Sequence, residues 1–207
     1  MFAGYVAAKM GLPVAKLIVA TNVNDILHRA LSEGDYSVGS VTPTAAPSMD
    51  IQVSSNFERL LFDLHGRDGT ALAASMRGFE ASRKFNLTPA MRAEAAELFT
   101  SIRVDPEGME MAMRRANESS AMVLDPHSAI GYAAALAADL PADVPVVTLA
   151  TAHPAKFRDA VERATGSRPL LPLRVGDLFD REERYDVLPA TLEAIETFVA
   201  ARAQETA

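Results

Sequence analysis

The sequence predicts an α/β fold built around a parallel sheet. Short apolar runs of strand length alternate with segments in which apolar residues recur every three or four positions, the spacing of one helical face. Several of these helical segments begin with a capping residue followed by proline. Polar residues follow the apolar runs, as they do at the ligand-binding edge of open α/β sheets.

The chain opens with a short predicted helix, because apolar residues recur at spacing four from Phe2 and a glycine then ends the pattern. Residues 17–20 are an apolar run of strand length and are predicted to form a buried parallel strand. A second helix is expected over residues 26–31, with Asn24 or Asp25 as its cap.

Residues 35–54 contain glycine, serine and proline with little periodicity and are predicted to form a polar loop. A loop of this length inside a compact protein is often functional. The helix after it carries leucines and a phenylalanine on one face over residues 57–64, and Ser55 or Asn56 is its expected cap.

Residues 85–120 are predicted to be a helical segment with two capped starts, at Thr88 and at Asp105, each followed by proline. We expect the apolar stripe of the first of these helices to include Phe99 and Ile102. Residues 121–165 are then predicted to hold two strand–helix units, with strands at 121–124 and 146–150. A last amphipathic helix is expected over residues 188–199.

Charge and composition exclude several classes of function. The net charge is −7 and no basic stripe is present, so we expect no nucleic-acid partner. No run approaches the roughly 18 apolar residues that a membrane helix needs, and the start does not resemble a signal peptide, so we expect no membrane partner. The absence of cysteine excludes a disulfide framework and a cysteine nucleophile, and it fits a cytoplasmic protein.

Three predicted strand ends are unusually polar: Thr21-Asn22, residues 125–128 and residues 151–153. Because the carboxyl ends of parallel strands share one edge of the sheet, we expect a site where these ends converge. The free N–H groups of the helix starts there would favour an anion or a polar ring atom. The simpler alternative is that Asp125 and Thr151 are helix caps, although Thr151 lies rather far ahead of the proline at 154.

Few other residue patterns point to catalysis. The histidines lack the spacing of metal ligands, so no metal site is expected, but His127 and His153 occupy equivalent places and one of them is a candidate pocket residue. No nucleophile elbow, Walker loop or glycine-rich dinucleotide motif is present. None of the four lysines reads as a desolvated nucleophile: Lys9, Lys16, Lys84 and Lys156.

Four long segments resemble threonine synthase of the long bacterial and fungal type. They read FAGYVAAKMGLPVAKLIVATNVNDILHRAL at 2–31, PSMDIQVSSNFERLLFDLHGRD at 47–68, LDPHSAIGYAAA at 124–135 and ATAHPAKF at 150–157. The strings are long and ordered, and the resemblance covers nearly the whole chain.

This resemblance implies a three-layer, parallel-sheet α/β fold of the pyridoxal phosphate (PLP) fold type II, tryptophan synthase β-like class. It implies PLP as cofactor and conversion of O-phospho-L-homoserine and water to L-threonine and phosphate. The family's glycine-rich phosphate loop is expected just before Phe2 and its Schiff-base lysine far upstream, so residues 1–207 correspond to the C-terminal part of the catalytic domain. We therefore expect an incomplete fold, no catalytic residue in this chain, no activity of the chain alone, and self-association through surfaces that the missing part would cover.

The resemblance also assigns residues. Thr151 matches the family threonine whose hydroxyl contacts the pyridine nitrogen of PLP, and a neutral hydroxyl suits an unprotonated ring nitrogen. Asn56, Arg59 and His127 are candidate substrate contacts, since arginine matches phosphate well. The alternative for the first two is structural: Asn56 caps its helix and Arg59 pairs with a surface acid. Asp125 is expected in the pocket wall.

Two other functions remain open at this stage. One is a threonine-synthase-like phospholyase, which would release phosphate from a related amino acid and yield a keto acid. The other is a non-catalytic interaction module, which would fold alone and bind a partner. An ordinary nucleotide-binding α/β enzyme is disfavoured by the missing glycine-rich motif.

Overall fold

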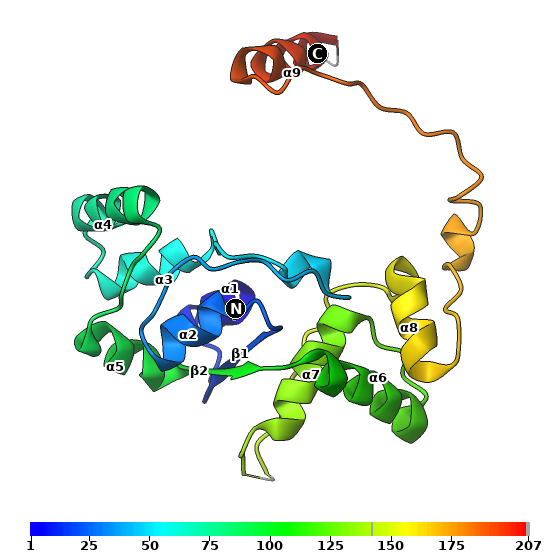
Figure 1. The fold of residues 1–207 in the computed structure, drawn as a ribbon, viewed down its shortest axis with the longest axis horizontal. Helices are drawn as coiled ribbons and strands as arrows, with labels where there is room; N and C mark the ends of the chain where they lie inside the picture. The colour runs from blue at the N-terminus through cyan, green and yellow to red at the C-terminus, as the bar shows by residue number, and fades with distance from the viewer. Residues whose placement is uncertain (142, 206–207) are drawn as a thin grey trace. The chain divides into compact units, whose positions relative to one another are not determined.

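The computed structural model describes residues 1–141 and 143–205, which form two compact units, Met1–Leu170 and Leu171–Ala207. The first unit contains both strands of the described chain and most of its helices (Figure 1). Its elements in order are α1 (Phe2–Lys9), β1 (Leu17–Thr21), α2 (Ile26–Ser32), η1 (Pro47–Met49), α3 (Phe57–Leu64), α4 (Gly69–Ser82), α5 (Pro89–Leu98), β2 (Phe99–Arg103), α6 (Pro106–Ser120), α7 (Pro126–Ala137), η2 (Pro154–Phe157) and α8 (Arg158–Thr165).

Strands β1 and β2 pair in parallel, with Leu17 opposite Phe99 and Thr21 opposite Arg103. The connection between them runs through helices, as a parallel pair requires. Within the described residues the sheet has these two strands. The predicted α/β class with parallel strands is therefore confirmed.

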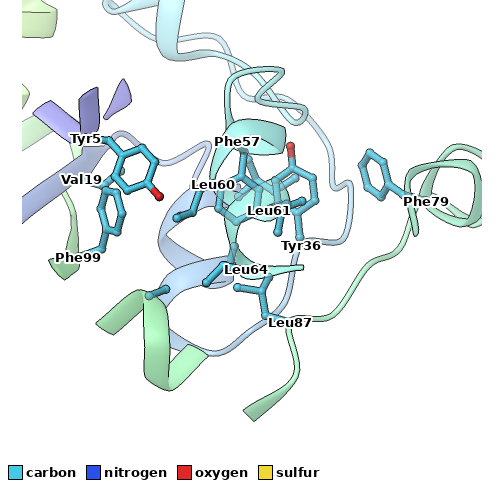
Figure 2. Packing of buried hydrophobic residues seen from close by; sticks show 13 residues of the cluster. Tyr5, Val19, Tyr36, Phe57, Leu60, Leu61, Leu64, Phe79, Leu87 and Phe99 are labelled. Carbon is cyan, nitrogen blue, oxygen red and sulfur yellow. The ribbon is translucent and has the colours of Figure 1, made fainter. Parts of the chain in front are cut away.

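The first face of the sheet is covered by helices α1 to α5. Val19 and Phe99 point to this side and join a cluster of buried aromatic and aliphatic residues. Figure 2 shows the α3 side chains in this cluster beside Tyr36, whose ring centroid lies 4.9 Å from that of Phe57 and 5.1 Å from that of Phe79. The apolar face predicted for residues 57–64 is fully used, because Phe57, Leu60, Leu61 and Leu64 are all buried.

On the second face of the sheet, α7 lies against β1, α6 packs on α7, and α8 packs on α6. Ile18, Ala20 and Ile102 point to this side and pack against a separate buried cluster that includes Met113 and Ile130. Successive residues of each strand thus feed two different cores, which is the period of two expected for a strand buried on both faces. The arrangement is three-layered, helices over sheet over helices, as the resemblance implied.

Most predicted helix ends are confirmed. The side chains of Thr88, Asp105 and Asp125 accept hydrogen bonds from backbone N–H groups in the first turns of α5, α6 and α7. After α1 the chain turns through Gly11 with φ +97°, a conformation that disfavours other residues. Asp25 and Asn56 occupy the N-cap positions of α2 and α3, as expected, but neither side chain makes a cap hydrogen bond.

The predicted helix over residues 89–102 is wrong at its end. It stops at Leu98, and residues 99–103 form strand β2. Phe99 and Ile102 fit the spacing of a helical apolar stripe, and they are also apolar residues of the strand. Periodicity alone therefore did not distinguish helix from strand here. Pairing with β1 settles the choice, because the backbone groups of FTSIR that face β1 gain ladder partners there.

The strands expected at 121–124 and 146–150 are also absent; both segments are irregular. A strand exists only where a neighbour accepts its hydrogen bonds, and within the described residues β1 and β2 pair only with each other. The helices after both segments form as expected. Helix α4 was not predicted, although Asp68 caps it and Leu72, Met76 and Phe79 recur along it.

The second unit contains η3 (Leu173–Val175) and α9 (Leu192–Glu205). The helix expected from residue 188 begins four residues later, and Arg202 in it pairs with Asp186 at 3.0 Å. A search of the described residues finds no helix with the length and apolar character needed to cross a membrane.

Candidate functional site

Asp125 is the centre of a buried group of hydrogen bonds at the start of α7. Asp125 is almost completely buried, with 1% of its surface exposed. One carboxylate oxygen accepts from the backbone N–H and from the Nδ1 of His127, both at 2.9 Å. The other accepts from the backbone N–H and the hydroxyl of Ser128. The predicted capping role is confirmed, and the carboxylate has two side-chain partners besides.

Thr151 is joined to this group through Ser128. The backbone N–H of Thr151 donates to Ser128 Oγ at 3.0 Å, while the Ser128 hydroxyl donates to Asp125. The Thr151 side chain is exposed, and within the described part of the chain its hydroxyl has no hydrogen-bond partner. We call Asp125, His127, Ser128 and Thr151 the Asp125 cluster. It presents a free hydroxyl on a backbone that is held in place.

His127 links the Asp125 cluster to the polar loop over residues 35–54. Its Nε2 accepts from the backbone N–H of Ser48 at 3.2 Å. Its ring packs against Phe157, with centroids 4.7 Å apart, and the side chain is 8% exposed. Both ring nitrogens are therefore engaged inside the chain, so a substrate contact through either would have to replace one of these bonds.

The polar loop is also tied to the end of β1. The amide groups of Asn22 and Asn24 both donate to Asp50 Oδ1, at 2.7 and 2.9 Å. The backbone N–H and the hydroxyl of Thr44 donate to the same carboxylate at 2.7 Å. Thr21, the last residue of β1, has a buried hydroxyl without a partner in the described residues.

The three polar strand ends named from the sequence thus meet in two ways. The segments at 125–128 and 151–153 contact each other directly, through Ser128. The end at Thr21-Asn22 joins them through the loop, by way of Asp50 on one side and Ser48 on the other. His153 does not mirror His127: it is exposed and caps η2 by accepting from Ala155. Thr151 is accordingly not a helix cap.

Asn56 and Arg59 make their contacts at a different place, on α3. The Arg59 guanidinium donates to Asn56 Oδ1 at 2.5 Å and lies 4.8 Å from the centroid of the Phe2 ring. Neither structural alternative is confirmed, since Asn56 makes no cap bond and Arg59 pairs with no acid in the described residues. Both side chains are exposed.

Arg59 borders an open groove of about 610 Å³ between α1, α3 and α4. Phe2 and Phe62 supply apolar walls, and a cluster of charges lies at the Asp63 end. Asp63 accepts from Tyr5 and from Arg67 and lies near Lys9. Burial raises the pKa of Tyr5 above its ordinary value, and the hydrogen bond to Asp63 raises it further.

The lysines are all exposed. Lys16 donates to the carbonyls of Ala96 and Glu97 at the end of α5, and Lys156 lies over the Phe157 ring. Among the described residues, no group of three histidine, aspartate or glutamate side chains is arranged to hold a metal ion.

Three site residues were quoted in sequence motifs but given no role: Ser48, Asp50 and Ser128. Asp50 and Ser48 belong to PSMD at 47–50, and Ser128 to LDPHS at 124–128. A short polar side chain two or three residues after a capping aspartate is the one signal that would have suggested Ser128. Nothing in the sequence indicates that Ser48 acts through its backbone.

The fold and this site define a class of protein: a three-layer α/β protein whose polar site lies where a strand end, a long loop and a helix start meet. Residues 128–199 match the family model described as threonine synthase, C-terminal. These residues are therefore similar to the C-terminal part of threonine synthases, and the chain as a whole is similar to such a protein over nearly all its length.

The relatives agree in sequence and in structure. A threonine synthase of Pseudomonas aeruginosa is 51% identical over 201 residues, which is 97% of this chain and 43% of the relative. The crystal structure of PLP-bound threonine synthase from Brucella melitensis matches with a TM-score of 0.86 and 44% identity, over 96% of this chain and 42% of that one. Yeast threonine synthase matches with a TM-score of 0.85 and 33% identity, over 99% and 45%. The chain spans about two fifths of the length of these relatives.

A human protein named threonine synthase-like 2 is also related, at 37% identity over 185 residues, 88% of this chain and 38% of that protein.

Proposed function

We propose that this chain supplies part of a PLP-dependent threonine synthase, which converts O-phospho-L-homoserine and water to L-threonine and phosphate. The observation that carries the proposal is the free hydroxyl of Thr151 on a backbone fixed by Ser128, in a chain related throughout to threonine synthases. In the proposal this hydroxyl donates to the pyridine nitrogen of the cofactor.

The residues of the site fit a pyridine ring nitrogen. A hydroxyl is neutral at any ordinary pH and can donate without forcing a proton onto the ring. Asp125, the nearest carboxylate in this cluster, is buried and already accepts four hydrogen bonds, so it is not free to bind the ring nitrogen. The ring would therefore meet a hydroxyl rather than an acid.

PLP, when bound, supplies the electron sink that lets phosphate leave the substrate and water add. This chain's own part is to hold and orient. Ser128 fixes the Thr151 backbone, and Asn22 and Asn24 hold the polar loop through Asp50. Arg59 is the proposed phosphate contact, because its guanidinium is exposed and has no acid partner in the described residues.

We also propose that no lysine of this chain anchors the cofactor. A Schiff-base lysine must be desolvated, whereas Lys9, Lys16, Lys84 and Lys156 are all exposed. Borohydride treatment of the chain with PLP, followed by mass spectrometry, should find no stoichiometric modification at one lysine. Stoichiometric labelling of a single lysine would overturn this assignment.

The test of the activity uses a chimera, in which the N-terminal portion of the Pseudomonas aeruginosa relative is followed by this chain. We expect it to form threonine and phosphate in equal amounts from O-phospho-L-homoserine. Thr151→Ala should lower kcat by about 100-fold, since one positioned donor is lost, whereas Thr151→Ser keeps the hydroxyl and most of the activity. Equal activity of all three proteins would contradict the role of Thr151.

Product analysis of the same chimera separates the second candidate, a threonine-synthase-like phospholyase, which the chain's similarity to a protein named threonine synthase-like 2 makes worth testing. Threonine as product supports the first proposal. A keto acid such as 2-oxobutyrate, released with phosphate and without threonine, supports the second. The higher identity to the Pseudomonas aeruginosa threonine synthase favours the first outcome.

A further inference from the structure

The hydrogen bonds of His127 determine which of its nitrogens carries the proton. The Asp125 carboxylate is an acceptor, so His127 Nδ1, at 2.9 Å, has to donate to it. The Ser48 backbone N–H is a donor, so His127 Nε2, at 3.2 Å, has to accept with its lone pair. Both bonds are satisfied together only by a neutral imidazole with its proton on Nδ1.

This ring also joins three segments that are far apart in the sequence. It belongs to the start of α7, it holds the polar loop through Ser48, and it packs on Phe157 just after the segment that carries Thr151. With its side chain 8% exposed, it is enclosed by these contacts rather than facing open solvent.

We propose that His127 is a positioning residue whose neutral, Nδ1-protonated form fastens the 35–54 loop to the segment of Thr151, and whose protonation releases the loop. In an imidazolium both nitrogens carry protons, so Nε2–H would face the Ser48 N–H, donor against donor, and that bond is lost. The bond to Asp125 persists, because the carboxylate accepts from either form. The loop is therefore the part that responds.

The charged and titratable groups on the packed elements are few. Asp125 lies beside Nδ1 and accepts its hydrogen bond. On the loop, Asp50 is two residues from Ser48 and is occupied by the asparagines at the end of β1. At η2, His153 accepts from the backbone N–H of Ala155 at 3.2 Å. Lys156 Nζ lies over the Phe157 ring, 5.8 Å from the ring centroid.

The effect on catalysis rests on the proposed function, because the loop and Thr151 matter to a reaction only if the cofactor binds between them. The tautomer and the attachment of the loop do not depend on it. They are properties of the chain's own hydrogen bonds and can be measured without cofactor or substrate.

The test is long-range ¹H–¹⁵N correlation NMR on the chain with ¹⁵N-labelled histidine, with His127 assigned by its loss in His127→Asn. Above the titration of His127 we expect the Nδ1–H tautomer, the minor form of a free imidazole. As the pH falls, the Ser48 amide resonance should shift with the same midpoint as His127. The protection factor of that amide against hydrogen exchange should be about tenfold lower when His127 is protonated. An Nε2–H tautomer, or a Ser48 amide indifferent to that midpoint, would overturn the proposal.

Two variants add a rescue. His127→Asn keeps a donor for Asp125 but is too short to reach Ser48, so Ser48 exchange should rise about tenfold at all pH values. His127→Gln places an oxygen near the position of Nε2 and should restore the protection of the Ser48 amide, with a protection factor that does not change with pH. His28→Asn, on α2, is the matched control and should leave Ser48 unchanged. If both variants unfold, the tautomer of His127 in the wild-type chain still tests the proposal. A chimera that makes no threonine while the tautomer is Nδ1–H would sink the proposed function alone.

Discussion

Two aspartates followed by proline start α6 and α7, and they show how much a residue's role depends on what surrounds it. Asp105 and Asp125 both accept from backbone N–H groups in the first helical turn. Asp105 is exposed and makes a single cap bond, to Gly108, whereas Asp125 is buried and also holds the side chains of His127 and Ser128. Sequence predicted the shared part of their roles and not the difference.

The first prediction compares these aspartates. Asparagine is as good a helix cap as aspartate, so Asp105→Asn should change the free energy of unfolding by only a few tenths of a kcal/mol. Asp125→Asn replaces one accepting oxygen by a donor inside a buried cluster and should cost about 2–3 kcal/mol. Urea unfolding at neutral pH measures both. Equal losses would mean that the Asp125 cluster adds nothing to its cap.

The second prediction concerns alkaline pH. Burial raises the pKa of Tyr36 above 10.0, the ordinary value, although its hydrogen bond to Ser54 acts in the opposite direction. Below pH 10 the phenol is protonated in both states and its contribution is complete. As the pH rises past 10 the unfolded chain loses the proton first, so stability falls. Burial is also the main reason why the pKa of Tyr5 is raised, so Tyr5 adds to the same loss of stability.

Urea unfolding from about pH 8 to pH 11 tests this, because Tyr36→Phe should fall less steeply with pH than the wild-type chain. Tyr185→Phe, which removes a hydroxyl from an exposed ring, is the control for the loss of a phenol. A slope unchanged by Tyr36→Phe would show that the buried phenol does not drive the alkaline loss.

At the scale of the element, local signals located helices well and strands poorly. A helix satisfies its own backbone, so a cap and a periodic stripe suffice to predict α5, α6 and α7. A strand needs a partner from elsewhere in the chain. This is why the predicted helix extends through Phe99 to Ile102 although these residues pair with β1. It is also why residues 146–150 are predicted as a strand although, in the part of the chain that the structure describes, no neighbour pairs with them.

The same limit explains the site. Thr151 was expected at a site from its motif, and Asp125 from its place after an apolar run. The contribution of the polar loop was only suggested by its length, since Ser48 acts through a backbone N–H that any residue but proline would supply. Distant contacts of that kind leave no local pattern.

The third prediction compares two glycines. Gly11, which ends α1, has φ +97° and no atom within 4 Å of an added Cβ, so Gly11→Ala should cost about 1 kcal/mol through backbone strain alone. Gly78 lies inside α4 with equally open space and ordinary φ, so Gly78→Ala should add up to about 1 kcal/mol. Thermal unfolding of the two variants should move in opposite directions. A shift in the same direction would contradict the assignment of strain to Gly11.

At the scale of the whole molecule, unit Met1–Leu170 has two cores on the two faces of a two-stranded sheet. In the described residues β1 and β2 each have one edge without a strand beside it. Apolar side chains such as Met10, Val147 and Leu149 are exposed. Open edges and exposed apolar residues favour association between copies.

The fourth prediction follows from these surfaces. The isolated chain should self-associate in a concentration-dependent way. In sedimentation velocity, its weight-average sedimentation coefficient should rise with protein concentration. The N-terminal portion of the relative, joined in the chimera, should reduce this. A single monomeric species at all concentrations would rule out association through these edges.

The proposed function depends on where the hydroxyl of Thr151 lies once a cofactor is bound. A crystal structure of the PLP-bound chimera measures this directly. We expect Thr151 Oγ1 at hydrogen-bond distance from the pyridine nitrogen, about 2.7–3.2 Å, with its backbone N–H still donating to Ser128. A ring nitrogen held by another residue, with Thr151 beyond hydrogen-bond reach, would contradict the account.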